Sequence, residues 1–281
     1  MLTRKTGYLT MARREAPAAS HELQEQGFVV LPQLLSAGEV AELRADIDRV
    51  FDELPPDVRN VVRDEDDFKP FRYEMFNRSA ACQRAIAHPG ILEVIEPLIG
   101  EDCHVIANTA WRQGPEPSNH GGRNWHIDSG PHIPRPAEVP WDDRIPYPVF
   151  AVAAHLMLMD CPIESGPTGV LARSHKSGQP PPFDRMTDDT LTYDGEPAIP
   201  LVLRAGDVAL FVSDVWHRRL PSSEGDPGRY FLQCHYGRRD LAQRVRPTAE
   251  VNQASDEAIA RATSPRDRTL IGLHQPFFYD G

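Results

Sequence analysis

The stretch "GDVALFVSDVWHRRLPSSEGDPGRYFLQCHYG" (206–237) contains two apolar runs separated by a turn-like segment. The first run, 207–212, follows Gly206, and the second, 229–237, follows "PSSEGDPG". Short runs rich in Val, Leu, Phe and Tyr, bounded by Gly, Pro, Ser and Asp, are typical of β-strands joined by irregular turns. The stretch therefore predicts two strands.

Runs of the same kind lie further towards the N-terminus, at 103–111, 149–160, 168–172 and 199–203. The 27 Pro and 19 Gly residues favour loops and short strands over long helices. Several strands joined by such turns indicate an all-β barrel or jelly roll. We therefore predict a mainly β fold with flanking helices and a double-stranded β-helix (jelly-roll, cupin-like) core, spanning about residues 101–240.

The rest of the chain is predicted to complete one domain, 21–281. Residues 1–20 lack an apolar core segment and are expected to be a flexible leader. Residues 21–100 are expected to form a helical layer on the β-helix. The tail, 241–281, ends in the apolar "TLIGLHQPFFYDG", which is expected to dock on the body.

Two signals locate helices within the helical layer. Ser36 and Glu39 have the spacing of a capping box, and an apolar series at helical spacing follows them: Val40, Leu43, Ile47, Phe51 and Leu54. "SAACQRAIAHPGILEVIEPLIG" (79–100) predicts two short helices, broken at Pro89 and ended at Gly100. Before them, "HELQEQGFVVLPQLL" (21–35) runs from a short helix into a strand at 28–31.

Composition excludes several classes of protein. The formal net charge of −11 argues against a nucleic-acid groove, which needs a basic stripe. No apolar stretch is long enough to span a membrane, and the N-terminus does not resemble a signal peptide. The four cysteines form no C-x-x-C pair, so we expect reduced, mostly buried thiols in a cytoplasmic protein.

"NWHIDSG" (124–130) places an imidazole and a carboxylate two residues apart. In a strand, residues i and i+2 point to the same face, so His126 and Asp128 could reach one metal ion. A surface His–Asp pair of little energetic weight is the other interpretation. A facial triad for iron needs a further histidine from a later strand.

His217, at the end of the run 207–212, is a candidate for that third ligand. If the chain folds as a hairpin about Ser223, His217 and Arg229 lie opposite each other, since both are six residues from Ser223. A histidine and an arginine would then flank one cavity. A loop histidine and an arginine paired with a nearby acid remain the alternative.

Together these segments resemble the phytanoyl-CoA dioxygenase family of iron(II)- and 2-oxoglutarate-dependent oxygenases. The resemblance covers about residues 21–240 and rests on "QEQGFVVLPQLLSAGEV", "WHID", "ESGPTGVLARSHKSG" and "GDVALFVSDVWHRRLPSSEGDPGR". Members usually have Pro-Gly before the Ser-His of the third motif. Here Ala172 and Arg173 stand in that place, so this turn is expected to differ in shape.

The resemblance implies His126, Asp128 and His217 as iron ligands and Arg229 as the partner of the far carboxylate of 2-oxoglutarate. Two imidazoles and one carboxylate leave three adjacent positions on octahedral Fe(II), for the keto acid and O₂. A guanidinium suits a carboxylate because it can bind it bidentately. By analogy, Asn108 and Thr168 are candidate contacts of the cosubstrate, or polar residues that bond the backbone.

Other polar and aromatic residues near these motifs have simpler interpretations. His132 is expected to be a solvated loop histidine, with a place at the substrate mouth as the alternative. His155 is expected to be a satisfied inward-facing histidine, and His175 a turn-stabilising residue. Trp125 and Trp216 each precede a ligand histidine and should therefore face the opposite side, as core.

The sequence thus predicts an oxygenase that oxidises an unactivated C–H bond of a small metabolite or natural-product intermediate and releases succinate and CO₂. Hydroxylation is the default, and desaturation, epimerisation and cyclisation stay open. The alternatives are a cupin-type metalloenzyme without keto acid and a non-catalytic jelly-roll binding module. No nucleic-acid or membrane partner is expected. The primary substrate, the oligomeric state and the roles of loops 112–148 and 173–198 are not determined by the sequence.

Overall fold

The computed structural model describes residues 3–5, 8–10, 16–53, 70–115, 122–241 and 254–274. At its centre lies a six-stranded antiparallel sheet, here the major sheet. Its strands follow the order β3 (Phe28–Leu31), β11 (Val208–Val212), β6 (Ala151–Met157), β13 (Arg229–Gly237), β5 (His104–Gln113) and β4 (Phe71–Tyr73). Most of these strands coincide with the predicted runs, whereas β4 was not predicted.

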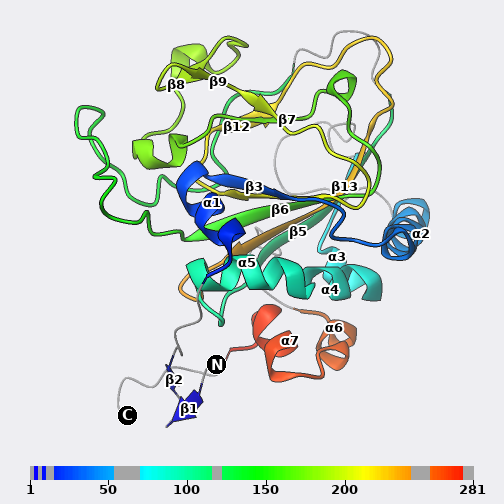
Figure 1. Ribbon diagram of the computed structural model, residues 1–281. Coiled ribbons are helices and arrows are strands. Elements are labelled where there is room, and N and C mark those ends of the chain that lie inside the picture. Colours follow the sequence, from blue (N-terminus) through cyan, green and yellow to red (C-terminus); the bar gives the residue numbers. More distant parts are fainter. Residues whose placement is uncertain are drawn as a thin grey trace.

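A second, smaller sheet faces the major sheet and lies above it in Figure 1. This minor sheet has the order β10 (Ile199–Pro200), β7 (Thr168–Val170) and β12 (His217–Arg219). Two sheets facing each other make the predicted jelly roll, so the fold class is confirmed. Two further two-stranded sheets pair β1 (Thr3–Lys5) with β2 (Tyr8–Thr10) and β8 (Thr192–Tyr193) with β9 (Glu196–Pro197). Three short 3-10 helices are η2 (Ile163–Ser165), η3 (Ser174–Ser177) and η4 (Phe183–Arg185).

The hairpin predicted for 206–237 is wrong. β12 pairs with β7 in the minor sheet, whereas β13 pairs with β5 and β6 in the major sheet. The segment between β12 and β13 therefore crosses from one sheet to the other. The equal distance of His217 and Arg229 from Ser223 in the sequence does not indicate this crossing. His217 and Arg229 consequently belong to different sheets.

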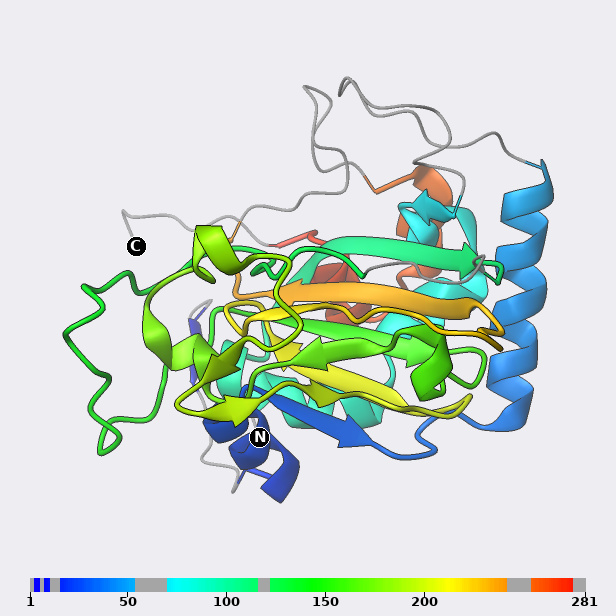
Figure 2. The same cartoon turned by 90° about the horizontal axis from the view of Figure 1, so that it is seen from above.

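Helices cover the face of the major sheet that points away from the minor sheet. They are α1 (Ala18–Gln26), α2 (Ala37–Glu53), α3 (Met75–Arg78), α4 (Ala80–Ile86) and α5 (Pro89–Ile99). In Figure 1, α4 and α5 lie below the sheet, and Figure 2 shows α2 along one end. The predicted capping box is present, because the Glu39 carboxylate accepts from Ser36 N at 2.8 Å and Ser36 Oγ accepts from Glu39 N at 3.3 Å.

The predicted helices at 79–100 are also confirmed, with Pro89 as the first residue of α5. The main hydrophobic core lies between these helices and the major sheet and contains Leu43, Ile47, Ile95, Leu156 and Leu210. All four cysteines are buried and free. No helix among the described residues is long and apolar enough to cross a membrane.

The two ends of the domain differ in part from expectation. The leader was predicted to extend to residue 20, but α1 begins at Ala18, and the buried Ser20 hydroxyl donates to the Val94 carbonyl at 2.7 Å. In the tail, α6 (Asp256–Arg261) and α7 (Pro265–Leu270) pack on the helical layer, and Leu270 and Ile271 are buried in its core. Residues 275–281 and Leu54 lie outside the described residues.

Alternation along β13 positions the functional site. Tyr230, Leu232, Cys234 and Tyr236 belong to the core on the helical side. The intervening residues, Arg229, Phe231, Gln233 and His235, line a cavity between the two sheets. One face of β13 thus packs in the hydrophobic core, and the other face lines the cavity.

Candidate metal centre

Three predicted ligands converge at the upper side of this cavity. His126 and His217 are joined by backbone hydrogen bonds in both directions, each 3.0 Å, and Asp128 N donates to Ser213 O at 3.0 Å. The segment 126–128 therefore runs along 213–217. The ligating atoms of His126, Asp128 and His217 all lie within 4.8 Å of one another.

Both histidines have a fixed orientation. Nδ1 of His126 donates to the Asn124 carbonyl at 2.8 Å, and Nδ1 of His217 donates to the Val215 carbonyl at 2.9 Å, in the tautomer that these carbonyls require. Such a bond leaves the Nε2 lone pair free and raises the basicity of the ring. The two Nε2 atoms lie 3.9 Å and 3.5 Å from Asp128 Oδ1.

Burial and the neighbouring imidazoles act on the Asp128 carboxyl in opposite directions. Burial raises its pKa, but His217, His235 and His126 more than offset this, so the pKa lies well below its ordinary value and the group is ionised. Among the described residues, buried Asp128 Oδ2 has no hydrogen-bond partner, and His235 Nδ1 lies 3.6 Å from it. An ionised carboxylate whose Oδ1 lies beside two imidazole Nε2 atoms fits a divalent cation, so the residues present suit an N₂O metal site.

Asp214 holds together the two segments that carry the ligands. This buried carboxylate accepts from Tyr147 Oη at 2.8 Å, from His132 Nδ1 at 2.5 Å and from His132 N at 3.1 Å. His132 also stacks on Phe150, with ring centroids 4.9 Å apart, and lines the cavity. His132 thus agrees with the alternative, a residue at the cavity, and not with the preferred interpretation as a solvated loop histidine. Asp214 was not predicted at all.

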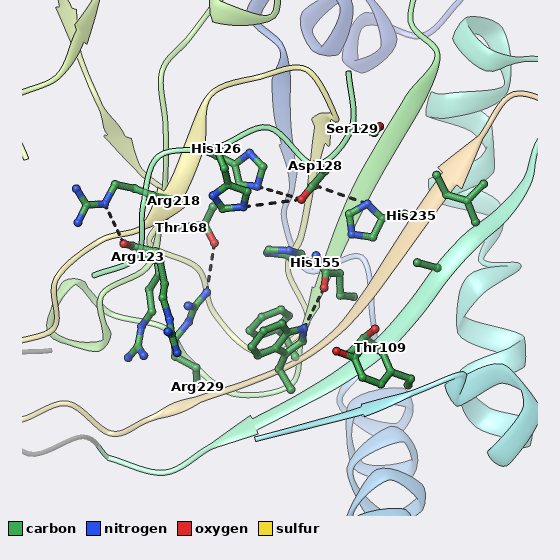
Figure 3. A pocket seen from close by; sticks show the side chains of 18 of the residues that line it. Thr109, Arg123, His126, Asp128, Ser129, His155, Thr168, Arg218, Arg229 and His235 are labelled. Carbon is green, nitrogen blue, oxygen red and sulfur yellow. Dashed lines mark hydrogen bonds and ion pairs between the residues drawn. The ribbon is translucent and has the colours of Figure 1, made fainter. Parts of the chain in front are cut away.

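The cavity below the three ligands has a volume of about 550 Å³. Arg229 and Thr168 line it, and Arg229 Nη2 donates to Thr168 Oγ1 at 3.2 Å. Figure 3 shows both residues on the same side of the cavity, below His126. The structure therefore brings five of the six predicted site residues to one cavity: His126, Asp128, His217, Arg229 and Thr168.

Asn108 does not join them. Its Oδ1 accepts from Phe76 N at 2.9 Å and its Nδ2 donates to Gln233 O at 2.8 Å, so it ties β5 to α3 on the helical side. Its neighbour Thr109 faces the cavity instead. Asn108 fits the alternative of a polar residue that bonds the backbone.

Several cavity residues were missed or misinterpreted. His155 and His235 line the cavity, and the Arg219 guanidinium donates to Gln113 Oε1 across it at 3.0 Å. His155 is not satisfied, because its buried Nε2 has no hydrogen-bond partner among the described residues. The alternation along β13 after Arg229 could have indicated His235. Trp125 and Trp216 pack together away from the cavity, as predicted.

Comparison with known proteins agrees with this geometry. The model of the phytanoyl-CoA dioxygenase (PhyH) family matches residues 23–224. The chain belongs to the phytanoyl-CoA dioxygenase family. It is accordingly an enzyme of the dioxygenase type. No curated protein sequence matches the chain.

Solved structures similar to this family member share its fold. The epimerase SnoN, crystallised with Fe³⁺, α-ketoglutarate and nogalamycin RO, is 21% identical, with a TM-score of 0.58 over 80% of this chain and 84% of its own. HygX from Streptomyces hygroscopicus, with nickel and 2-oxoglutarate, is 18% identical with a TM-score of 0.58, over 82% and 90%. The α-ketoglutarate-dependent carbocyclase SnoK is 19% identical with a TM-score of 0.57, over 82% and 87%.

One turn departs from the family's usual sequence while keeping a glycine-like backbone. Arg173, in the place where members usually have glycine, adopts φ 65° and ψ −4°. Its amide donates to the Gln26 carbonyl at 2.8 Å, and its guanidinium pairs with Asp143 at 3.0 Å. This phytanoyl-CoA dioxygenase family member thus places a charged side chain in a left-handed conformation that favours glycine.

Proposed function

We propose that His126, Asp128 and His217 bind Fe(II), that Arg229 binds the far carboxylate of 2-oxoglutarate, and that the enzyme oxidises a C–H bond of a small metabolite or natural-product intermediate. In the default reaction, one oxygen atom of O₂ enters succinate and the other forms a hydroxyl on the substrate. Bound iron and keto acid supply the oxidant for that step. CO₂ leaves from the keto acid.

The observation that carries the proposal is the state of Arg229. Its side chain is buried, and it faces the three ligands from the opposite sheet. Among the described residues it contacts the neutral Thr168 hydroxyl, the Cys161 thiol and the face of Phe231, 5.0 Å from the guanidinium carbon. The carboxylate of Asp226 also acts on its charge. Burial lowers the pKa of Arg229 to about 10, so it is still a cation at neutral pH. A buried cation without a carboxylate partner is costly unless an anionic ligand completes it.

The residues of the cavity have separate roles in this reaction. The backbone carbonyls of Asn124 and Val215 hold the two imidazoles with Nε2 towards the centre. Arg229 orients the cosubstrate by charge-assisted hydrogen bonds. The cavity continues past Thr109, Ile106 and Leu241, and we assign this part to the primary substrate.

A cupin-type metalloenzyme without keto acid would leave the charge of Arg229 unexplained. A non-catalytic binding module would require neither the oriented imidazoles nor the orphaned carboxylate oxygen of Asp128. The charge of Arg229 therefore favours the oxygenase over the first alternative, and the arrangement of the three candidate ligands favours it over the second.

The test is anaerobic titration of the Fe(II)-loaded protein with 2-oxoglutarate. We expect a weak visible charge-transfer band in the wild type, and loss of iron binding in the folded D128A variant. The exposed Asp240, which pairs with Arg238 at 3.1 Å and lies outside the cavity lining, provides a matched control. D240A should bind iron and 2-oxoglutarate like the wild type. Absence of the band at saturating iron and keto acid, or normal iron binding by D128A, contradicts the proposal.

A further inference from the structure

His235 reaches a predicted metal ligand from the major sheet. It lies on β13, lines the cavity, and places its Nδ1 atom 3.6 Å from Asp128 Oδ2 (Figure 3). The side chain of His235 is 14% exposed and that of Asp128 is 18% exposed, so the contact is largely shielded from solvent. It connects Asp128 to the same strand that carries Arg229.

The ladder between β13 and β5 is irregular next to His235. His235 pairs with Ala107, whereas the following residue, Tyr236, pairs with Val105, so Ile106 is an extra residue of β5. Ile106 and Ala107 both line the cavity together with His235. Bulges of this kind occur next to active sites, where they re-aim side chains. The irregularity thus coincides with the residue that contacts Asp128.

The two oxygen atoms of Asp128 have different surroundings. Oδ1 lies 3.9 Å from Nε2 of His126 and 3.5 Å from Nε2 of His217. Oδ2 is closed to solvent and has no hydrogen-bond partner among the described residues, and His235 lies next to it. A buried carboxylate oxygen that water does not reach is costly unless a neighbouring side chain donates to it. Oδ1 therefore faces the two imidazoles, and Oδ2 faces His235.

We propose that His235 is a positioning residue for Asp128, whose Oδ2 accepts from His235 Nδ1–H in the metal-loaded protein while Oδ1 is left to the metal. This inference rests on the proposed function, because it takes Asp128 as a ligand. The separation of 3.6 Å is longer than a hydrogen bond, and hydrogen bonds at active sites often tighten when the ligands bind. A carboxylate that offers one oxygen occupies one coordination position, which keeps three adjacent positions available for the keto acid and O₂.

The test compares Fe(II) affinity in the wild type and in variants of His235, by anaerobic titration and by the Fe(II)-dependent rise in Tm. H235F should bind Fe(II) about ten- to a hundredfold more weakly, because a metal-binding carboxylate loses its outer partner. In H235N the amide nitrogen takes the place of Nδ1, so this variant should recover part of the affinity. H235Q places its amide nitrogen near the position of Nε2 and should recover less. The order of the two amides distinguishes a directed hydrogen bond from the volume of the side chain.

His104 provides the matched control. It is a buried histidine on the neighbouring strand β5, it lies outside the cavity lining, and its Nε2 donates to the Leu241 carbonyl at 2.8 Å. H104F should lower the Tm of the metal-free protein and leave Fe(II) affinity within about twofold, a small difference in binding free energy.

Two failures can be told apart. If the wild type binds Fe(II) and D128A does not, but H235F binds Fe(II) like the wild type, the assignment of His235 is wrong and the proposed function stands. If the wild type itself binds no Fe(II) and shows no rise in Tm, the proposed function fails, and the assignment of His235 fails with it. Equal weakening in H235F and H104F, or no recovery in H235N, would also overturn the assignment, since either would indicate a general loss of structure.

Discussion

His217 and Arg229 face one cavity from two different sheets. His217 is the first residue of β12 in the minor sheet, and Arg229 is the first residue of β13 in the major sheet. Under the proposed function, R229A should weaken 2-oxoglutarate binding by about ten- to a few hundredfold while iron stays bound, because one charge-assisted bond is lost.

R229K should fall between R229A and the wild type, since it keeps the charge but loses the bidentate fork. Anaerobic 2-oxoglutarate titrations and melting curves of both variants check this. A folded R229A protein with wild-type affinity would remove Arg229 from the cosubstrate site.

Asp214 should contribute to stability, because it joins segments that lie far apart in the sequence. D214N keeps the shape of the side chain but weakens the hydrogen bonds that it accepts from Tyr147 and His132. We therefore expect the free energy of unfolding to fall by about 2–4 kcal/mol. Iron affinity should fall as well, because the loop after Asp128 is released. Urea unfolding and iron titration measure the two effects, with Y147F as a milder variant that removes one of the bonds.

Gly228 and Gly225 form a matched pair before Arg229. Both have left-handed backbone, with φ 92° and 88°. A Cβ at Gly228 would overlap the Gln113 backbone carbonyl, whereas a Cβ at Gly225 meets nothing within 4 Å. G225A should therefore cost only about 1 kcal/mol of conformational strain, and G228A clearly more, with weaker 2-oxoglutarate binding. Equal losses in the two variants would mean that the Gln113 contact is unimportant.

Two variants at Arg173 distinguish the effect of backbone strain from the effect of the side-chain ion pairs. R173A loses the ion pairs with Asp143 and Glu25 but keeps a Cβ at positive φ, whereas R173G loses the same pairs and relieves the strain. R173G should thus be about 1 kcal/mol more stable than R173A. Chemical denaturation of the two variants checks the difference. No difference would show that this position tolerates a Cβ without strain.

Stability should fall on acidification because of His175. Burial lowers the pKa of His175 to about 4, from an ordinary value near 6.5. At pH values between these two pKa values, the unfolded chain binds more protons than the folded protein. The contribution of neutral His175 to the free energy of unfolding is therefore present above about pH 6.5 and is lost as pH falls towards 4. The loss for one such group is of the order of 3 kcal/mol. Unfolding free energies at pH 7.5 and 5 should differ less in H175F than in the wild type.

Much of the architecture could be predicted because it follows from local patterns. The strands at 207–212 and 229–237 and the α2 capping box depend on residues close in sequence. The pairing of β12 and β13 depends on which sheet each strand joins, and a turn of suitable composition does not specify that. The hairpin prediction therefore failed although its two strands are real.

The same distinction holds for the site. The two-residue spacing of His126 and Asp128 made them candidate ligands, and the resemblance to the family selected that interpretation over a surface pair. Asn108 and Thr109 differ by one position, and that position decides which face of β5 each one occupies. The register of β5 with β13 shifts between His235 and Tyr236, which sequence does not reveal. The unsatisfied state of His155 likewise follows from contacts with Phe211 and Phe231, far away in the chain.

The division of the site between two sheets has a consequence for partial unfolding. The two histidines are paired through their backbones, whereas Asp128 bonds Ser213, whose amide donates to Ala151 of β6 in the major sheet. The three predicted ligands are therefore tied to both sheets, and any separation of the sheets would disturb them as well as Arg229. Under the proposed function, opening of the sheets should thus release the metal and the keto acid in one step.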